Sequence, residues 1–453
     1  MKKRYSTTAV LFAVIALVAA ACGGTSAETT TIATAAPSAE SPTSSAAPDT
    51  TTTTTAPPEP VTLNLITNWV GDSNKASALS SIVEEFEAAN PDIKVLVEGV
   101  AKDNDITNRV ETQFLAGEEP DIILHFGAGA TANWIPDGVT IPVTELAEEW
   151  GLTDKFLPGA LNEYTTDDGT LVAFPLEGFA IPLWYNTEIL AQAGVDEIPV
   201  TTTDFLAAAE KIRAAGFQPL ATSGADWMTP LVLSNTTADD NSTLAEGGWA
   251  DNANIRRAVE EWVALRDGGA FIDNFEGVDF GVAEETFFNG EAGILYSGTW
   301  AYASLPPELE GKVVIAPQPV IPGAPFYDSP WWWAGFGAKG IHISRNGGEK
   351  LGAVEKFVKF FYQGEMIARF VEQAGMVPPL KDVPVDESVL SDLFVQTIAL
   401  GPDVTLLKPH PEAAIPGAVF DSWYAGAYTL PAIPGTTVDE ILEFWDTLYD
   451  DNL

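Results

Sequence analysis

Tryptophans with a carboxylate close by in the sequence recur in segments that fall between predicted strands and helices. The chain has 13 Trp residues; Trp69 stands three residues before Asp72, and Asp226 directly precedes Trp227. An indole ring offers a flat apolar face, and a carboxylate beside it accepts hydrogen bonds. Together these residue types favour binding of a molecule with an apolar face and a polar rim, and they also suit a cation.

Sequence signatures of covalent, phosphate-transfer or cofactor chemistry are absent. No nucleophile elbow, P-loop, zinc motif or dinucleotide fingerprint occurs. The three histidines, His125, His342 and His410, lack the spacing of metal ligands. With 64 Asp and Glu residues, a carboxylate pair at glycosidase spacing would arise by chance, so their number does not indicate an enzyme. We therefore expect a non-enzyme without cofactor or metal; a surface glycosidase is the enzymatic alternative.

The formal net charge of −42 restricts the partners of the chain. Binding to nucleic acid depends on Lys and Arg neutralising phosphates, and a strongly acidic surface repels them. We therefore expect no nucleic-acid partner and interpret the charge as a solvated acidic surface.

The N-terminus has the order of a secretion signal. A basic start at Lys2, Lys3 and Arg4 precedes an apolar run over 10–21, and Cys22 follows three alanines. The run is too short to span a bilayer comfortably as a helix. The arrangement resembles a bacterial lipoprotein lipobox, which implies removal of residues 1–21 and lipidation of Cys22. That motif prefers Leu where this chain has Ala19, so cleavage without lipidation is the alternative.

A Thr-, Ala- and Pro-rich segment over 22–60 separates the signal from the folded part. Its single large aliphatic residue, Ile32, cannot bury enough surface to offset the entropy of the chain. We predict a disordered tether there. Cys22 is the only cysteine, so the folded part has no intrachain disulfide.

The pattern after residue 60 alternates between strands and helices. Val61, Leu63 and Leu65 alternate with polar residues as in a strand, and a helical stripe then runs until Asn90 and Pro91. Further strands are expected at 93–97, 121–124, 294–296 and 313–316, and further helices at 105–116, 204–215, 253–266 and 353–374. This alternation is typical of an α/β fold with mainly parallel sheets flanked by helices.

Several sequence blocks resemble the extracellular solute-binding proteins of ABC importers, family 1, which includes maltose-binding proteins. Each block is weak alone, but their order and spacing together are specific. The blocks are Ile82–Val95, Ala116–Ile123, Pro182–Gly194, Phe288–Trp300, Ile341–Ser344 and Glu372–Pro378.

The resemblance implies a two-lobed periplasmic-binding-protein fold of type II. It places the hinge crossings near 182–186, near 317–322 and after 375–379. The N-lobe would comprise 61–183 and 320–377, and the C-lobe 184–319 and 378–453. Ligand would close the lobes about this hinge.

The resemblance also implies a ligand site between the lobes. The residues expected there are Trp69, Asp72, Phe126, Glu177, Phe179, Asp226, Trp227, Trp300, Trp331, Trp332, Trp333, Trp423 and Tyr424, with Ser297 and Thr299 as weaker candidates. In the run 331–333, neighbouring side chains on a strand point to opposite faces, so only one or two can reach a cleft. Six other tryptophans are expected in the core: Trp134, Trp150, Trp184, Trp249, Trp262 and Trp445.

The candidate loops contain no Arg or Lys, which a phosphate or carboxylate ligand would normally require. A neutral carbohydrate is therefore the expected ligand, and a cationic solute such as a polyamine or a choline-like molecule is the alternative. The resemblance implies a monomer on the outer face of the cytoplasmic membrane, held by a lipid anchor and serving an ABC transporter permease.

Overall fold

The computed structural model describes residues 59–71, 73–100, 103–166, 168–225, 227, 231, 244, 246–324, 330–400, 405–407, 419 and 429–452. The chain divides into two units between residues 57 and 58, and the described residues all belong to the second unit. The predicted signal, Cys22 and all but the last two residues of the predicted tether lie outside the described residues.

Within the described residues, the first sheet has six strands. They are β1 Val61–Thr67, β2 Ile93–Gly99, β3 Ile122–His125, β4 Phe174–Ile181, β9 Trp331–Ile343 and β10 Thr405–Leu407. The order is β10-β9-β3-β1-β2, and β4 also pairs with β9. β1 runs parallel to β2 and β3, whereas β9 runs antiparallel to β3 and β4.

The second sheet has four strands in the described part of the chain. They are β5 Leu183–Asn186, β6 Gln218–Ala221, β7 Ala292–Tyr296 and β8 Val313–Ala316, in the order β6-β7-β5-β8. β6 is parallel to β7, but β5 is antiparallel to both β7 and β8. The α/β class is thus confirmed, and mainly parallel pairing is a correction for this sheet. Two parallel strands of one sheet must be joined by a crossover connection. β5 instead enters this sheet directly from β4 of the first sheet, and it pairs antiparallel with both neighbours.

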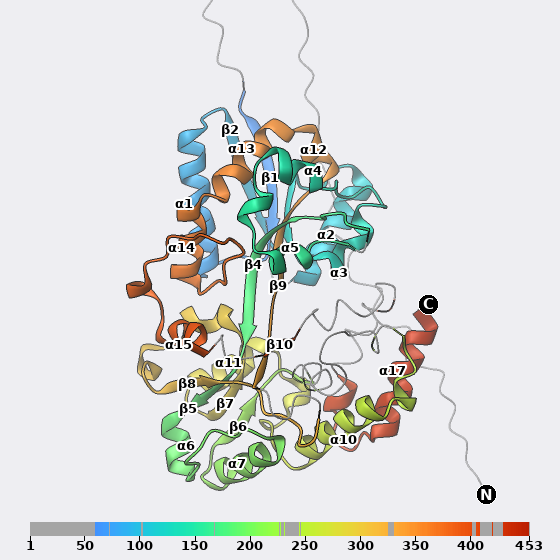
Figure 1. Cartoon of the computed structure of the whole chain (residues 1–453), viewed down its shortest axis with the longest axis vertical. Helices are drawn as coiled ribbons and strands as arrows, with labels where there is room; N and C mark the ends of the chain where they lie inside the picture. Colours follow the sequence, from blue (N-terminus) through green and yellow to red (C-terminus); the bar gives the residue numbers. More distant parts are fainter. Residues whose placement is uncertain are drawn as a thin grey trace, which may run out of the picture. The chain divides into compact units, whose positions relative to one another are not determined.

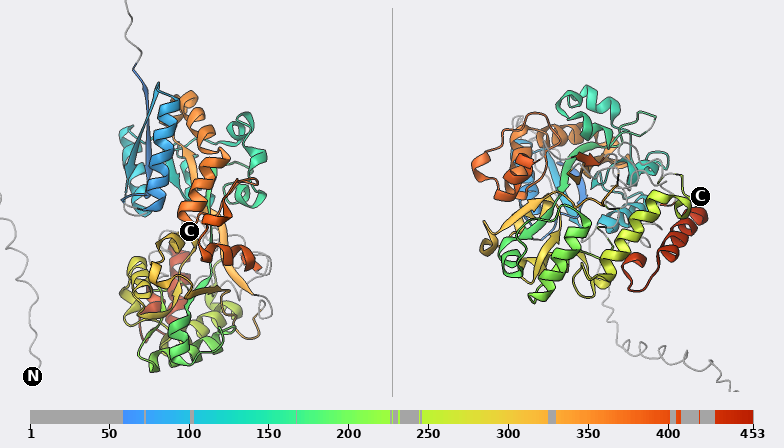
Figure 2. Two further views of the ribbon diagram at one scale, coloured as in Figure 1. Left: turned by 90° about the vertical axis from the view of Figure 1, so that its left-hand side faces the viewer. Right: turned by 60° about the horizontal axis from the view of Figure 1, so that its bottom comes forward.

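Helices flank both sheets, as Figure 1 shows. The helices are α1 Asn74–Ala89, α2 Asp103–Ala116, α3 Ala128–Thr131, α4 Thr144–Glu149, α5 Pro158–Asn162, α6 Thr187–Ala193, α7 Thr202–Ala214, α10 Ala253–Asp267, α11 Phe280–Phe288, α12 Arg345–Glu349, α13 Leu351–Phe361, α14 Gly364–Ala374, α15 Asp392–Leu400 and α17 Val438–Asn452. α1, α2 and α13 contact the first sheet, and α6, α7, α11 and α15 contact the second. Figure 2 shows α1 alongside α13 and α14.

The longer helices form where the local sequence signals predict them. The side chain of Ser73 accepts a hydrogen bond from the backbone of Ala76 and caps α1, which ends before Asn90. Thr201 caps α7 in the same way, by accepting from Asp204. The helices and strands expected near these positions are therefore confirmed.

The single helix expected over 353–374 is wrong, because two helices occupy it. α13 ends at Phe361, and Gln363 is extended before α14 begins. The hydroxyl of the buried Tyr362 donates to the backbone oxygens of Phe174 and Pro175 at 3.0 and 2.7 Å. The amphipathic period continues through this region, but contacts with β4 decide where the first helix ends.

The chain passes between the two sheets at Pro182, which is the one residue separating β4 from β5. It returns to the first sheet through β9 and leaves α14 again at Gly375. Pro182 lies within the crossing predicted near 182–186, whereas the crossings predicted near 317–322 and after 375–379 stay predictions. The lobe boundaries themselves stay a prediction.

Each sheet has its own large cluster of buried apolar side chains. The six tryptophans expected in the core are all at most 7 % exposed, which confirms that expectation. Trp184, Trp249, Trp262 and Trp445 pack with the second sheet, and Trp150 packs with the first. The folded part therefore stabilises itself by burial.

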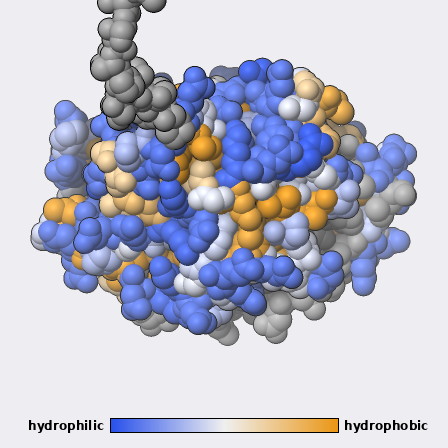
Figure 3. Space-filling view, turned by 90° about the horizontal axis from the view of Figure 1, so that it is seen from above, coloured by the Kyte–Doolittle hydropathy of each residue, from blue (hydrophilic) through white to orange (hydrophobic). Residues whose placement is uncertain are grey.

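The surface in Figure 3 is mainly hydrophilic, with smaller hydrophobic areas between. In the described ranges, which leave out the apolar run over 10–21, no helix is long and apolar enough to cross a membrane.

Candidate functional site

Three aromatic rings meet where β4 and β9 pass from one sheet toward the other. The ring centroid of Phe179 in β4 lies 5.6 Å from that of Trp333 in β9, edge to face, and 6.2 Å from that of Trp300. Trp300 belongs to the 3₁₀ helix η5 (Thr299–Ser304), directly after β7. Phe179 and Trp333 are nearly buried, whereas Trp300 is half-buried. Trp300 is therefore the ring of this group with the most surface left for a ligand.

An ion pair lies on the same strand as Phe179. Lys75, in the first turn of α1, pairs with Glu177 of β4, and their side chains are 18 % and 5 % exposed. The ammonium of Lys75 also lies 5.7 Å from the ring centroid of Trp69. Trp69, in the loop after β1, is buried, and its ring centroid lies 5.1 Å from that of Phe370. A charge and its partner are thus set beside aromatic rings at the end of β1.

A second lysine lies across the strand pair from Glu177. Lys339 of β9 is the register partner of Glu177, and its ammonium lies 4.7 Å from the ring centroid of Phe126. Burial lowers the pKa of Lys339 well below its ordinary value, and the nearby charge of Lys75 lowers it further. The carboxylate of Glu163 lies on the neighbouring part of β9, where it accepts from the backbone of Phe336 at 2.8 Å.

A buried stack of rings holds the backbone at Phe126. The ring centroid of Trp134 lies 5.4 Å from that of His125 and 5.5 Å from that of His342. Nε2 of His342 lies 2.9 Å from the backbone oxygen of Phe126, so this nitrogen is the donor. Burial lowers the pKa of His125 to about 3 and that of His342 to about 4. Both imidazoles are therefore neutral at neutral pH, and they position Phe126 without adding charge.

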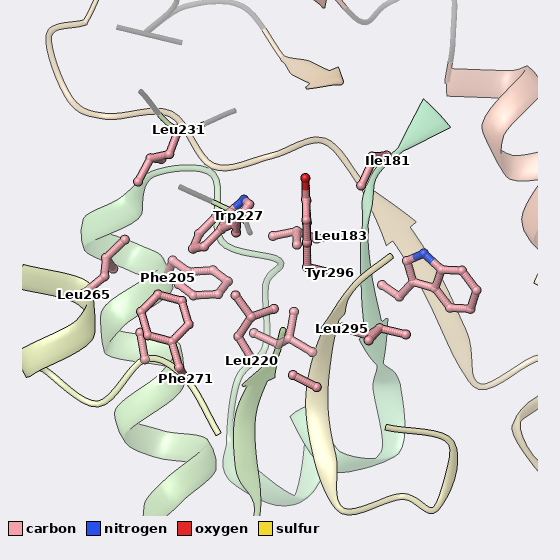
Figure 4. Packing of buried hydrophobic residues seen from close by; sticks show 14 of the residues in the cluster. Ile181, Leu183, Phe205, Leu220, Trp227, Leu231, Leu265, Phe271, Leu295 and Tyr296 are labelled. Atoms are coloured by element: carbon pink, nitrogen blue, oxygen red, sulfur yellow. The ribbon is translucent and has the colours of Figure 1, made fainter. Parts of the chain in front are cut away.

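Other expected site residues lie in the interior. Trp227 is fully buried against Phe205 and Phe271, as Figure 4 shows. Its indole donates to the side chain of Gln318 at 2.7 Å. Such surroundings favour a core role for this ring, and its assignment to the ligand site stays a prediction.

The side chains in the run 331–333 alternate as expected for a strand. Trp331 and Trp333 join the cluster of the second sheet, whereas Trp332 packs with Ala180 in a separate one. All three are at most 8 % exposed. Trp333 is the member in contact with Phe179, so it stands nearest to the candidate site.

Of the remaining residues expected at the site, some are buried and the others lie outside the part of the chain that the structure describes. Ser297 and Thr299 are buried on either side of Gly298. Asp72, Asp226, Trp423 and Tyr424 lie outside the described residues.

Lys75, Lys339 and Glu163 were missed in the sequence. The candidate loops do lack Lys and Arg, but a helix start and a strand interior supply the two lysines instead. The signal for Lys339 was a lone charge inside an otherwise apolar and glycine-rich strand. A buried charge in such a strand needs a partner, which marks it as a residue to examine.

Trp69 also lines a hollow of about 570 Å³ between the start of α1 and β2. Ser77, Ser80 and Glu84 of α1 form one wall, and Val97 and Gly99 of β2 form another. Among the described residues, no group of three His, Cys, Asp or Glu side chains could hold a metal ion. The arrangement suits reversible binding through rings and hydrogen bonds.

Two mixed sheets, flanked by helices and joined by strands that pass between them, define the class of type II periplasmic binding proteins. The chain belongs to the bacterial extracellular solute-binding protein family, whose model matches residues 81–394. Members of this family are binding proteins.

Known relatives and structures agree with this membership. The chain is 26 % identical over 326 residues to the sn-glycerol-3-phosphate-binding periplasmic protein of Rhizobium meliloti, covering 66 % of this chain and 71 % of that one. It is 30 % identical over 177 residues to a probable sugar-binding periplasmic protein of Mesorhizobium japonicum, covering 36 % and 40 %. A crystal structure of a probable secreted solute-binding lipoprotein from Streptomyces coelicolor superimposes with a TM-score of 0.71 at 28 % identity, covering 87 % of this chain and 99 % of that one.

Proposed function

We propose that this chain captures a neutral sugar or oligosaccharide in a cleft between its two lobes and delivers it to the permease of an ABC importer. The observation that supports this most is the meeting of Phe179, Trp300 and Trp333 beside the Lys75–Glu177 pair. Rings of this kind stack on the apolar faces of sugars. Charged groups that already pair with each other can still donate to and accept from hydroxyls.

The charges near the rings favour a neutral ligand over an ionic one. Lys75 and Glu177 offset each other as an ion pair, and burial disfavours the charged form of Lys339, so the pair leaves neither sign in excess. A polyamine or choline-like ligand would meet the ammonium groups, and a phosphate would meet the carboxylates. Each would lose solvation without a matching gain.

A glycerol-phosphate ligand is the second candidate function. The relative from Rhizobium meliloti is named for that ligand, and Lys75 supplies a cationic side chain of the kind that a phosphate needs. Against it, Lys75 is already paired with Glu177, and such a ligand would have to break that pair. Thermal unfolding with sugars and with sn-glycerol 3-phosphate separates the two candidates.

We further propose that the protein is anchored outside the cytoplasm through lipidated Cys22, that it acts as a monomer and that it has no enzymatic activity. The sequence order of the signal, Cys22 and the tether supports the anchor. The family supports an extracytoplasmic place. The alternative activity, a surface glycosidase, would release product from oligosaccharides, and incubation followed by chromatography tests it.

The ligand class can be tested by thermal unfolding followed by calorimetry. The panel contains maltotriose, chitotriose, xylotriose, raffinose, sn-glycerol 3-phosphate, choline and spermidine. A ligand that binds only the native state and is present at a hundred times its Kd stabilises that state by about 2.7 kcal/mol. We expect at least one sugar to raise the melting temperature and the charged solutes to leave it unchanged. Stabilisation by the phosphate or an amine, without any by a sugar, would overturn the proposal.

A further inference from the structure

One face of α11 is directed at the ring of Trp300. Phe280 and Glu284 are four residues apart on this helix, so their side chains lie on the same face. The ring of Phe280 lies 5.9 Å from that of Trp300. Glu284 accepts a hydrogen bond from the hydroxyl of Ser297 at 2.7 Å. The side chain of Trp300 lies close enough to this carboxylate to lower its pKa, against the larger effect of burial, which raises it. One carboxylate therefore holds Ser297 and lies beside Trp300 in the segment that follows β7.

Gly298, which follows Ser297, has no side chain and so leaves room for the ring of Trp300. Gly298 lies directly against Trp300, and a methyl group on Gly298 would overlap the six-membered part of the indole. The backbone oxygen of Ser297 accepts from Nε1 of Trp184 at 3.0 Å, which fixes the start of the segment in the core. Trp300 is thus bounded by Phe179, Phe280 and Gly298, and the carboxylate of Glu284 lies near its side chain.

A carboxylate is a costly choice for a half-buried position in a helix. Burial raises the pKa of Glu284, which means that its charged form is disfavoured there. An apolar side chain would fill the same space without that cost. What the carboxylate adds is an acceptor that binds the hydroxyl of Ser297 and a second oxygen that can accept from the nearby indole.

We propose that Glu284 is a positioning residue that fixes the plane of Trp300, so that the indole is held ready as a stacking platform. The inference rests on the proposed function for its effect on ligand affinity, but not for the contact itself. Glu284 does not touch the ligand in this proposal; it acts through Trp300.

The contact can be tested without any ligand. The full-length secreted protein is labelled with 5-fluorotryptophan, and the fluorine NMR resonance of Trp300 is assigned as the one missing from Trp300→Phe. Glu284→Met keeps the volume and removes the acceptors, whereas Glu284→Gln keeps an acceptor. We expect the Trp300 resonance to shift or broaden in Glu284→Met and to stay near its position in Glu284→Gln. The matched control, Glu285→Met, changes the exposed neighbour on α11 and should leave the resonance unchanged.

The functional effect is tested by a double-mutant cycle with maltotriose and chitotriose as probes. We expect Glu284→Met to weaken affinity about tenfold, as for one or two lost hydrogen bonds, and Glu284→Gln to weaken it less than about threefold. In a Trp300→Ala background, Glu284→Met should have almost no further effect, because both changes remove the same platform.

The outcomes separate the two proposals. An unchanged Trp300 resonance in Glu284→Met, or an equal loss of affinity in both backgrounds, would overturn the positioning role. If neither sugar binds the wild-type protein while the resonance responds as expected, the sugar-binding proposal fails and the positioning role stands.

Discussion

Trp300 differs from the other tryptophans of the described residues because its side chain is only half-buried, whereas theirs are buried. The rings of Phe179 and Phe280 lie beside it, yet the ring stays half-buried instead of entering the core. Trp184 and Trp262, in contrast, each donate to a backbone oxygen and are fully buried. A half-buried ring held in one orientation is what a stacking site requires, because such a ring needs no rearrangement before binding.

We predict that Trp300→Ala lowers sugar affinity by about 2 kcal/mol, roughly thirtyfold, because aromatic anchors dominate binding energy where they occur. Calorimetry with the sugar found in the thermal screen measures this. Trp423→Ala is predicted to act in the same direction. Trp445→Phe, at a buried position of α17, is the control and should change unfolding but not affinity. A folded Trp300→Ala variant with unchanged affinity would return this ring to a packing role.

The buried histidine pair gives the fold a pH dependence of known sign. His125 and His342 have pKa values of about 3 and about 4 in the folded chain, because burial disfavours their charged forms. In the unfolded chain both titrate near 6.5. The unfolded state therefore takes up protons first as pH falls, and stability is lost below about pH 6.5.

We predict that lowering the pH from 8 to 5 costs about 2 kcal/mol of unfolding free energy for each of these histidines. Urea unfolding at both pH values measures the change. His342→Gln keeps a donor for the backbone oxygen of Phe126 and should reduce the loss, while His410→Gln serves as the control. Equal pH dependence in the wild type and in His342→Gln would contradict this account.

At the scale of elements, β9 has two roles along its 13 residues. Its first part, with the tryptophans, pairs with β10, and its last part pairs antiparallel with β3. Glycines at 335, 337 and 340 lie between or near these parts and let large groups approach the backbone. An added methyl at Gly335 would stand 2.7 Å from the carboxylate of Glu163. At Gly340 it would overlap the ring of Tyr164.

We predict that Gly340→Ala destabilises the protein by about 1–3 kcal/mol, because Tyr164 is fully buried and cannot move aside. Gly352→Ala is a control of opposite sign. Nothing lies within 4 Å of a methyl at that position of α13, so alanine should stabilise by up to about 1 kcal/mol. Urea midpoints of the two variants measure both effects, and equal midpoints would contradict the role assigned to β9.

At the scale of the whole molecule, the passages of the chain between the sheets permit a hinge. β4 and β5 are separated only by Pro182, and β9 returns near the same place, so few residues would need to change their dihedral angles. The candidate site stands beside this crossing. A ligand that contacts residues of both sheets would favour the closed arrangement by its differential affinity.

We predict that small-angle scattering of the secreted protein shows a smaller radius of gyration when the sugar is present, because the ligand favours closure. The same measurement with Trp300→Ala at the same sugar concentration should show less compaction. An adhesive or purely structural surface protein would show no change with sugar, and that outcome would argue against the transport role.

The sequence by itself determined the α/β class, the family and most of the elements. Alternation in β1, the Ser73 cap of α1 and the Thr201 cap of α7 are local, since each depends on residues within one or two turns. The burial of tryptophans such as Trp184 also followed from residue type. Local periodicity reports which face of an element is buried, and so these predictions held.

Only the tertiary structure decided which side chains meet. Phe179, Trp300 and Trp333 come from distant parts of the chain, as do Lys75 and Lys339. The end of α13 likewise depends on the bonds from Tyr362 to the backbone of β4. The physical reason is that periodicity marks a face as buried without stating what covers it. That partner is selected by packing over the whole fold, where long-range contacts outweigh local preference.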